Sequence, residues 1–354
     1  MRPPPVPPPV PVPAPAPAAP LTAPASTPPP TPTPPAAPPT PPASAPPRLP
    51  RPPAPPALTA LLALATAAVL LTTGCGRQGS PPAKGPRAAD LPAYRVDRGF
   101  ALPASPTWSA AHRRGSLVIG VKDDQPYLGE RDPATGTYSG FDIEIAKMSA
   151  ASLGFRPDRI RWKAVASANR ETALSNGQID LYVGTYTINA LRKKQVGFAG
   201  PYYLAGQGLL VRAGEHGIHG PWDLKGRKVC SAAGSSSIQR IEADYPQATA
   251  VTYDTYSVCV DNLLTYQVDA VTTDDSILTG YAAKAPDEMK VVGRPFSEEP
   301  YGIGLARGDT ALRYALDDAI VAHERAGDWR KAYAATLGLS GRPAPAPPPV
   351  DRYR

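Results

Sequence analysis

Residues 185–203 read Thr185-Tyr-Thr-Ile-Asn-Ala-Leu-Arg-Lys-Lys-Gln-Val-Gly-Phe-Ala-Gly-Pro-Tyr-Tyr203, a polar stretch directly after the short apolar run Ile179–Val183. In open α/β sheets, ligands bind beyond the carboxyl ends of the strands. If the apolar run is a strand, Thr185 and Thr187 lie just past that end, and one or two helical turns after them place Arg192 near both hydroxyls. A guanidinium beside hydroxyls and free N–H groups suits a carboxylate. The alternative is a surface arginine in a basic Arg-Lys-Lys run.

Short apolar strands alternate with amphipathic helices on both sides of this stretch. The alternation predicts an α/β fold with mainly parallel sheets and helices on both faces. Extended runs near Gly208 and Pro300 predict two crossovers between two lobes, with a ligand cleft between the lobes. Strands are expected over 117–121, 160–165, 179–183, 228–232, 250–253 and 270–273, and helices over 140–153, 169–175, 256–266, 310–325 and 328–336 and from 236 and 277.

Composition separates this body from the ends of the chain. The first 56 residues contain 29 of the 49 prolines and no aromatic residue, which predicts a disordered leader. The net charge is +7, yet residues 101–340 hold 26 basic and 27 acidic residues, so nucleic acid is not an expected partner. The expected domains are lobe 1 over 109–211 and 301–340, lobe 2 over 212–300, and a Pro-rich disordered tail over 341–354.

An export signal is expected over residues 57–75. An uncharged apolar run follows Arg48 and Arg51 and ends in Thr72-Thr-Gly-Cys75, which is typical of a secretory signal. The ending resembles a bacterial lipobox, in which the cysteine becomes lipidated, although Leu71 lies one position before the usual place. A plain amino-terminal membrane anchor is the alternative. Residues 76–108 are expected to be a flexible tether between the anchor and the body.

Seven motifs in order give the body a family resemblance. The body resembles the family 3 solute-binding proteins of polar amino-acid ABC importers, and among these the glutamate-binding lipoproteins of bacteria. The resemblance implies a two-lobed venus-flytrap fold with two crossover strands, of the periplasmic-binding-protein type. The motifs lie at 140–146, 176–180, 185–203, 223–226, 229–236, 269–275 and 298–304.

The resemblance implies a site for the α-amino and α-carboxylate groups of an amino acid. The carboxylate clamp falls on Arg192, with Thr185 and Thr187 as hydroxyl or backbone partners. The residues Gly234-Ser235-Ser236 open a helix whose free N–H groups, together with the Ser236 hydroxyl, suit the other side of the carboxylate. Ser236 has the alternative role of a plain N-cap. The ammonium-binding acid falls on Asp274, and its neighbour Asp275 is a solvated N-cap in the alternative interpretation.

The resemblance also suggests which side chain the pocket accepts. In similar aspartate- and glutamate-binding proteins, cations at the positions of Lys122 and Arg170 contact the distal carboxylate of the ligand. Two such cations favour glutamate or aspartate over glutamine, because a neutral amide leaves buried charge without a partner. Gln125 and Tyr127 are expected in the pocket wall. The alternative for Lys122 and Arg170 is a surface charge at the end of a strand or helix.

The remaining cysteines and the histidines have no expected chemical role. In an exported protein, Cys230 and Cys259 are expected to form a disulfide, with two buried free thiols as the alternative. The four histidines are scattered, so no metal site is expected. No cofactor is expected either.

Three functions remain open at this stage. The first is the extracellular binding subunit of an ABC importer, a lipid-anchored monomer that takes glutamate or aspartate, or glutamine in the alternative, and delivers it to a permease. The second is an enzyme on the same fold, such as a cyclohexadienyl dehydratase, with Asp274, Asp275 and Glu298-Glu299 as potential acids. The third is a cell-wall or signalling module that uses the Pro-rich segments and binds no solute.

Overall fold

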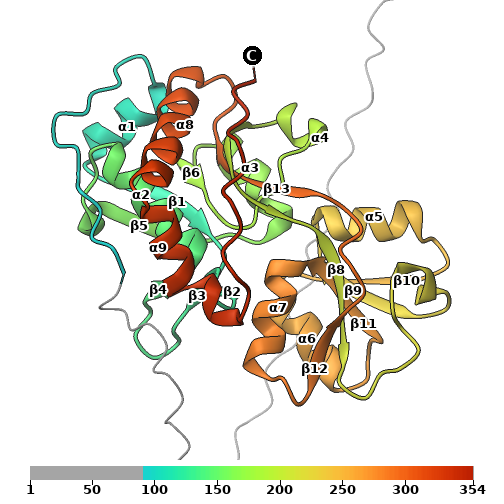
Figure 1. Ribbon diagram of the computed structural model, residues 1–354. Helices are drawn as coiled ribbons and strands as arrows, with labels where there is room; N and C mark the ends of the chain where they lie inside the picture. The colour runs from blue at the N-terminus through green and yellow to red at the C-terminus, as the bar shows by residue number, and fades with distance from the viewer. Residues whose placement is uncertain (1–90, 354) are drawn as a thin grey trace, which may run out of the picture. The chain divides into compact units, whose positions relative to one another are not determined.

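The computed structural model describes residues 91–353 (Figure 1). The chain divides into two units, Met1–Cys75 and Gly76–Arg354, and all described residues belong to the second. The predicted leader, the signal, the lipid site at Cys75 and the first part of the tether lie outside the described residues. None of the helices between residues 91 and 353 combines the length and the apolar character that crossing a bilayer requires.

The first lobe is built on a five-stranded sheet with the strand order β5-β1-β6-β13-β7. β1 is parallel to β5 and β6, whereas β13 is antiparallel to β6 and β7. The β1 sequence Leu-Val-Ile-Gly-Val is almost entirely buried, as expected for a strand covered on both faces. The strands are β1 (Leu117–Val121), β5 (Ile160–Ala164), β6 (Leu181–Tyr182), β7 (Gly197–Ala205) and β13 (Glu299–Leu305).

Aromatic packing holds the helices of this lobe together. Trp329 and Tyr333 stack where α2, α8 and α9 meet, and Phe141 meets both rings edge-on, with 5.3 Å between the ring centroids of Phe141 and Trp329. A separate cluster of the same lobe combines Leu174 with Tyr186 and other residues. The helices are α1 (Pro106–Arg114), α2 (Phe141–Ser152), α3 (Arg170–Ser175), α4 (Ala190–Lys193), α8 (Thr310–Arg325) and α9 (Asp328–Ala335).

The second lobe has its own five-stranded sheet, in the order β10-β9-β11-β8-β12. The predicted disulfide is confirmed: Cys230 on β9 and Cys259 on α6 are joined by an S–S bond of 2.02 Å. Its elements are β8 (Gln207–Arg212), β9 (Lys228–Ala232), α5 (Ser236–Asp244), β10 (Thr249–Tyr253), α6 (Tyr256–Leu264), β11 (Ala270–Asp274), α7 (Asp275–Lys284) and β12 (Met289–Val292).

A small three-stranded sheet between β1 and α2 was not predicted. Its strands have only two or three residues, too few to show an alternating pattern. They are β2 (Asp124–Gln125), β3 (Gly129–Arg131) and β4 (Tyr138–Ser139). Short 3-10 helices complete the described part: η2 (Pro157–Arg159), η3 (Ser167–Asn169), η4 (Pro221–Leu224) and η5 (Leu337–Ser340).

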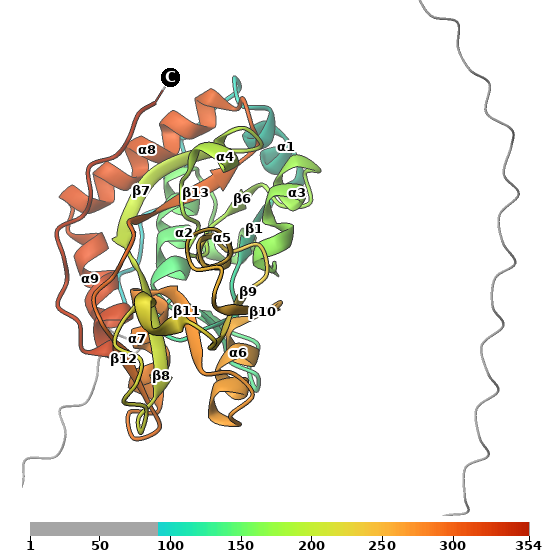
Figure 2. The same ribbon diagram turned by 90° about the vertical axis from the view of Figure 1, so that its right-hand side faces the viewer.

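Two crossovers join the lobes, as the family resemblance implied. Figure 2 shows β7 passing toward β8, and Gly206 lies between these strands. A Cβ atom at Gly206 would meet Pro295 and Ser297 at 2.6 Å, so the first crossover requires glycine. The predicted lobe boundaries were slightly wrong, because β8 pairs with β11 and β12 and therefore places residues 207–211 in lobe 2. Both sheets are mixed rather than mainly parallel, since β13 in the first sheet and β8 in the second are antiparallel to both of their neighbours.

The predicted tether ends earlier than expected. Tyr94, Phe100 and Leu102 pack against the core of the first lobe. Ser105 caps α1 through a 2.9 Å hydrogen bond from the Trp108 N–H, and a proline follows the cap. The prediction of a flexible tether as far as residue 108 was therefore wrong for residues 91–108, because apolar side chains among the prolines pack, partly buried, against the core.

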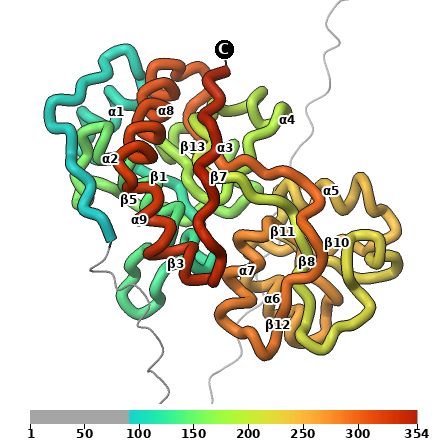
Figure 3. Tube along the Cα trace, viewed as in Figure 1, coloured from blue at the N-terminus to red at the C-terminus, as the bar shows by residue number. Residues whose placement is uncertain are grey.

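The prediction of a disordered tail over 341–354 was also wrong for the part described. Figure 3 shows this segment running back along the first lobe beside β7. The Asp351 N–H donates to the Gly200 carbonyl at 2.8 Å, and the Phe198 N–H donates to the Tyr353 hydroxyl at 2.9 Å. Proline restricts the unfolded chain, so ordering a Pro-rich segment loses little conformational entropy once its ends are anchored.

Candidate functional site

Arg192 lies at the junction of the two lobes. It belongs to the one-turn helix α4, which Asn189 caps by accepting the Arg192 N–H at 2.9 Å. Its side chain is buried, and Nη1 donates to the Thr187 carbonyl at 2.8 Å. Nη2 donates across the cleft to the Gly234 carbonyl of lobe 2 at 3.3 Å, and Nε lies 3.2 Å from Glu171 Oε1. The predicted carboxylate clamp thus faces the cleft.

Arg170 lies beside Arg192 and shares its partners. It opens α3, is 2% exposed and donates from Nη2 to the same Gly234 carbonyl at 3.3 Å. Both guanidinium groups lie over the ring of Tyr186, at 4.4 Å and 5.2 Å from its centroid. Burial and the charge of Arg170 lower the pKa of Arg192 to about 10. An anion between the two arginines would relieve this repulsion.

Lys122 is the third buried cation of the cleft. It follows β1, is 2% exposed, and its Nζ lies 5.7 Å from the ring centroid of Tyr256 in lobe 2. Burial lowers the pKa of Lys122 to about 8; Asp124 opposes the shift and Arg170 adds to it. Across residues 91–353, Lys122 has no salt bridge to an acid. The alternative of a surface charge therefore fails for both Lys122 and Arg170.

Thr185 and Gln125 brace the loop rather than face outward. The Thr185 backbone has a φ of +46°, a left-handed conformation that is strained for a β-branched residue. Its N–H donates to Asp142 Oδ2 at 2.9 Å, and Asp142 Oδ1 accepts from the Tyr202 hydroxyl at 2.7 Å. The Thr185 hydroxyl exchanges hydrogen bonds of 3.1 and 3.2 Å with the Gln125 amide. These bonds hold the strained turn that presents Thr187 to the cleft.

The two serines at the start of α5 have different roles, and the N-cap alternative for Ser236 is wrong. Ser235 is the N-cap, since its hydroxyl accepts from the Ile238 N–H at 3.1 Å, so its side chain is not free for a ligand. Ser236 is not the cap: its hydroxyl lies 3.4 Å from Thr187 Oγ1 and donates to Glu299 Oε2 at 2.9 Å. Ser236 and Thr187 therefore meet across the cleft.

Asp274 and Asp275 point to different surroundings. Asp274 Oδ2 accepts from the Tyr301 hydroxyl at 2.7 Å, whereas its buried Oδ1 has no hydrogen-bond partner among the described residues. Burial and the charge of Glu299 raise the pKa of Asp274 to about 8. Asp275 instead accepts from the Gly206 N–H and pairs with Arg342 at 2.6 Å. Asp274 thus offers the unpaired oxygen that an ammonium group needs.

Asp124 links the lobes at the far side of Lys122. The Thr255 side chain makes no cap for α6, and Asp124 of lobe 1 supplies one instead. Asp124 Oδ2 accepts from the N–H groups of Tyr256 at 2.8 Å and Ser257 at 3.2 Å. A carboxylate at a helix N-terminus is favourable for both hydrogen bonding and the helix dipole. Asp124 is therefore a latch for the closed arrangement.

Changing Asp124 to alanine is expected to raise the Kd for all bound amino acids by the same factor. A lost cap costs roughly 1 kcal/mol, which corresponds to about a fivefold weaker affinity. Calorimetric titration at pH 6.5, below the pKa of about 8 that burial gives Lys122, measures the effect. Asp123→Ala is the matched control, because Asp123 also faces Lys122 electrostatically but makes no hydrogen bond to α6. An equal loss in both variants would contradict the latch.

Several cleft residues could not be found from the sequence. Glu171, Tyr186, Tyr256 and Tyr301 meet the predicted residues only after folding; the one available signal is that Tyr186 lies between the two predicted threonines. Tyr127 is not placed in the pocket by any contact, since its ring lies under Lys284, 4.9 Å from Nζ.

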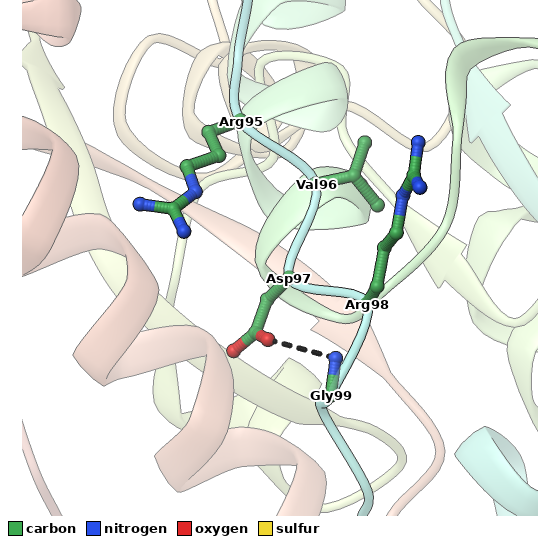
Figure 4. Close-up of a pocket in the computed structure, with 5 residues that line it drawn as sticks. All are labelled: Arg95, Val96, Asp97, Arg98 and Gly99. Carbon is green, nitrogen blue, oxygen red and sulfur yellow. Dashed lines mark hydrogen bonds between the residues drawn. The ribbon is translucent and has the colours of Figure 1, made fainter.

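A surface pocket of the described part lies away from this cleft. Figure 4 shows its lining, Arg95 to Gly99, in which Asp97 Oδ1 accepts the Gly99 N–H at 3.1 Å. It contains none of the cleft residues. Within residues 91–353, no three histidine, cysteine or acidic side chains gather as a metal site would need.

Comparison with known sequences identifies the family. Residues 117–338 match the bacterial extracellular solute-binding proteins, family 3. The glutamate-binding protein GluB of Corynebacterium efficiens is 38% identical over 239 residues, which are 65% of this chain and 81% of that protein. The ABC transporter glutamine-binding protein GlnH of Bacillus subtilis is 35% identical over 272 residues, covering 75% and 92% of the two chains.

Solved structures agree with this match. An ancestral arginine-binding protein bound to arginine is 34% identical, with a TM-score of 0.58, and covers 62% of this chain and 97% of its own. The ancestral amino acid-binding protein AncCDT-1, a precursor of cyclohexadienyl dehydratase, is 28% identical, with a TM-score of 0.60 and coverages of 65% and 99%. The two-lobed periplasmic-binding-protein fold is thereby confirmed.

Proposed function

This chain belongs to the bacterial extracellular solute-binding proteins of family 3, and from that premise we propose that it captures glutamate or aspartate for an ABC importer. It is an amino-acid-binding subunit of an ABC transporter and acts outside the cytoplasm. Relatives of this kind are named for glutamate, glutamine, cystine and arginine, so the acidic ligand is the proposal.

The buried cations of the cleft carry this proposal. Lys122 and Arg170 are each 2% exposed, and Glu171 lies 3.8 Å from Arg170 Nε, beyond hydrogen-bonding distance. Buried cations without a close anion are unfavourable, and a distal carboxylate placed between them would offset that cost. Arg192 supplies the cation for the α-carboxylate. The pKa of Asp274 is raised to about 8 without a ligand, and an ammonium group at its free oxygen favours the charged form, so Asp274 supplies the anion once the ligand is bound. A basic ligand would add a further positive charge to this group.

A titration panel tests the choice of ligand. L-glutamate, L-aspartate, L-glutamine, L-arginine and L-histidine are titrated into the purified protein, and glutamate or aspartate is expected to bind at least about thirtyfold more tightly than glutamine, as for one lost charged hydrogen bond. Equal affinities for glutamate and glutamine would contradict an acidic ligand.

The preference for an acidic ligand is expected to fall at alkaline pH. The distal carboxylate binds the ammonium form of Lys122, whose pKa is lowered to about 8 by burial. As the pH rises through this value, Lys122 loses its proton and the affinity for glutamate falls, by up to about tenfold per pH unit. Binding of glutamine depends on the same other titrating groups, including Asp274. The ratio of the Kd of glutamine to the Kd of glutamate therefore reports on the protonation of Lys122 alone.

This ratio is measured by titration between pH 6 and 9.5. It is expected to stay constant up to about pH 7.5 and then to decrease. In Lys122→Met the ratio should be small and independent of pH. A wild-type ratio that does not change across this range would show that Lys122 does not contact the ligand.

The proposal includes attachment to the outer face of the membrane and delivery to a permease. Its support is the Thr72-Thr-Gly-Cys75 ending, which lies outside the described residues. Cys75→Ser should move the protein from the membrane fraction to the soluble fraction; retention in the membrane would leave a plain apolar anchor as the explanation.

One observation favours an enzyme as a second candidate. Asp274 is buried in the cleft, and its pKa is raised to about 8, so the carboxyl group holds a proton at neutral pH as a general acid does. A dehydratase acting on prephenate would use such a group. Incubation with prephenate and detection of phenylpyruvate by absorbance decides the question, and an Asp274→Asn variant serves as the blank.

A further inference from the structure

Residues 342–353, here called the C-terminal strap, lie beyond the region that matches the family, which ends at residue 338. The strap includes the Pro-rich run 343–349 and ends beside the helix that carries Arg192. Figure 3 shows its course along β7. An addition to the family fold that reaches a binding residue invites a functional explanation.

The first residues of the strap are anchored beside the first crossover between the lobes. Arg342 pairs with Asp275 of lobe 2 at 2.6 Å, and Asp275 also accepts the N–H of the crossover residue Gly206 at 3.2 Å. The Tyr333 hydroxyl donates to the Pro343 carbonyl at 3.2 Å. A proline-rich segment favours an extended course, so a fixed start directs the strap toward its far end.

The far end of the strap holds α4. Lys193 Nζ donates to Asp351 Oδ2 at 3.2 Å and lies 3.8 Å from the ring centroid of Tyr353. The guanidinium carbon of Arg313 on α8 also lies over the Tyr353 ring, 4.2 Å from its centroid, and the Tyr353 hydroxyl accepts from the Phe198 N–H. Tyr353 is thus fixed by β7 and α8 and presents its ring to the residue directly after Arg192.

α4 has little else to keep it in place. It is a single turn of four residues, too short to be stable alone. Ala190 and Leu191 are exposed, and Leu191 is 65% exposed, so no apolar side chain of α4 is buried. Its own side chains are supported by the Asn189 cap, the contacts of Arg192 and the contacts of Lys193 with the strap. Its flanks are held by the Ile188 N–H, which donates to the Pro300 carbonyl at 2.8 Å, and by the buried Val196.

We propose that the C-terminal strap positions Arg192 for ligand binding, with Asp351 and Tyr353 as positioning residues that act through Lys193. This inference rests on the proposed role of Arg192 in the amino-acid site. Arg192 binds the α-carboxylate, which all amino acids share. Loss of the strap therefore raises the Kd of every amino acid by one common factor and leaves the discrimination between side chains unchanged.

The experiment compares three variants of the full chain. Asp351→Ala combined with Tyr353→Ala removes both contacts to Lys193, whereas Tyr353→Phe keeps the ring over Lys193 and removes only the hydroxyl. Arg352→Ala is the matched control: it removes a charge from the same strap, but its partner is Asp318 on the exposed side of α8. Hydrogen exchange followed by mass spectrometry reports on residues 190–196 without ligand, and titration gives the Kd values of glutamate and glutamine.

In the double variant, the amides of residues 190–196 are expected to exchange faster, and both Kd values should rise about tenfold, as expected for losing one cation–π contact and one hydrogen bond. Tyr353→Phe should show a smaller rise, and Arg352→Ala none. Unchanged exchange would overturn the inference, and so would faster exchange with unchanged Kd values, because the strap would then only stabilise the fold.

A failure of the proposed ligand remains distinguishable from a failure of the strap. If wild-type protein prefers another amino acid, that amino acid replaces glutamate in the titration and the expected common factor stays the same. If the double variant does not fold, Tyr353→Phe carries the comparison, since it retains the packing of the ring.

Discussion

Replacing Arg192 with alanine is expected to raise the Kd of every amino acid by about a thousandfold. Removing one member of a buried, hydrogen-bonded charge pair costs roughly 4 kcal/mol, because the partner stays buried without its counter-charge. Here two anions would be left, the α-carboxylate of the ligand and Glu171, which lies 3.2 Å from Arg192 Nε. No other residue of α4 is buried, so nothing in the helix replaces the guanidinium.

Calorimetric titration of glutamate and glutamine measures this loss, with thermal unfolding as a check on folding. Arg192→Lys should lie between wild type and alanine, because an ammonium keeps the charge but not the fork that matches two oxygens. Lys194→Ala is the control, since Lys194 is exposed in the same segment. Binding of both amino acids to Arg192→Ala within about threefold of wild type would remove Arg192 from the site.

Replacing Lys122 with methionine is expected to weaken the binding of glutamate but not that of glutamine. The Kd of glutamate should rise about a hundredfold, the effect of losing a buried charged contact of roughly 2.7 kcal/mol. The Kd of glutamine should stay the same or fall, because methionine keeps the length of lysine without the cost of a buried charge. Titration of both ligands at pH 7 gives the two ratios.

Arg170→Met is the companion variant and is expected to show the same direction. Its effect is less specific, because Arg170 also donates to the Gly234 carbonyl and lies over Tyr186. Lys163→Met controls for the loss of a lysine, since Lys163 is exposed on β5. Equal losses of affinity for glutamate and glutamine in Lys122→Met would show that the cations do not distinguish between the side chains of the ligands.

Elements with a strong local pattern could be predicted to the residue. β1, β9 and α8 begin and end where the sequence indicates, because buried apolar runs and an Asp309 cap mark them. α1 is not predicted, although Ser105 followed by proline is a recognisable helix start, because the proline-rich surroundings are typical of a tether. The strap was missed for the same reason. Composition alone does not distinguish a free Pro-rich segment from one anchored at both ends.

Site residues could be predicted where the order of strands and helices along the chain is enough to place them. Residues at strand ends, such as Lys122 and Asp274, are placed by the alternation of strands and helices. Contacts across the cleft could not be predicted. Asp124 and the start of α6 are 132 residues apart in the sequence, and no local pattern indicates that they are in contact. The choice between capping and cleft-facing serines could not be made for a similar reason: the neighbours Ser235 and Ser236 differ only in which residue begins the first helical turn.

The two crossovers also determine the order in which the protein is completed during export. Lobe 2 is one continuous piece between β8 and β12, and both cysteines of its disulfide lie within it. Lobe 1 is interrupted, since its sheet needs β13, which follows all of lobe 2. As the polypeptide emerges amino end first, the later lobe in sequence can close and oxidise while the earlier one still waits for its last strand, its covering helices and the final residues that brace Arg192.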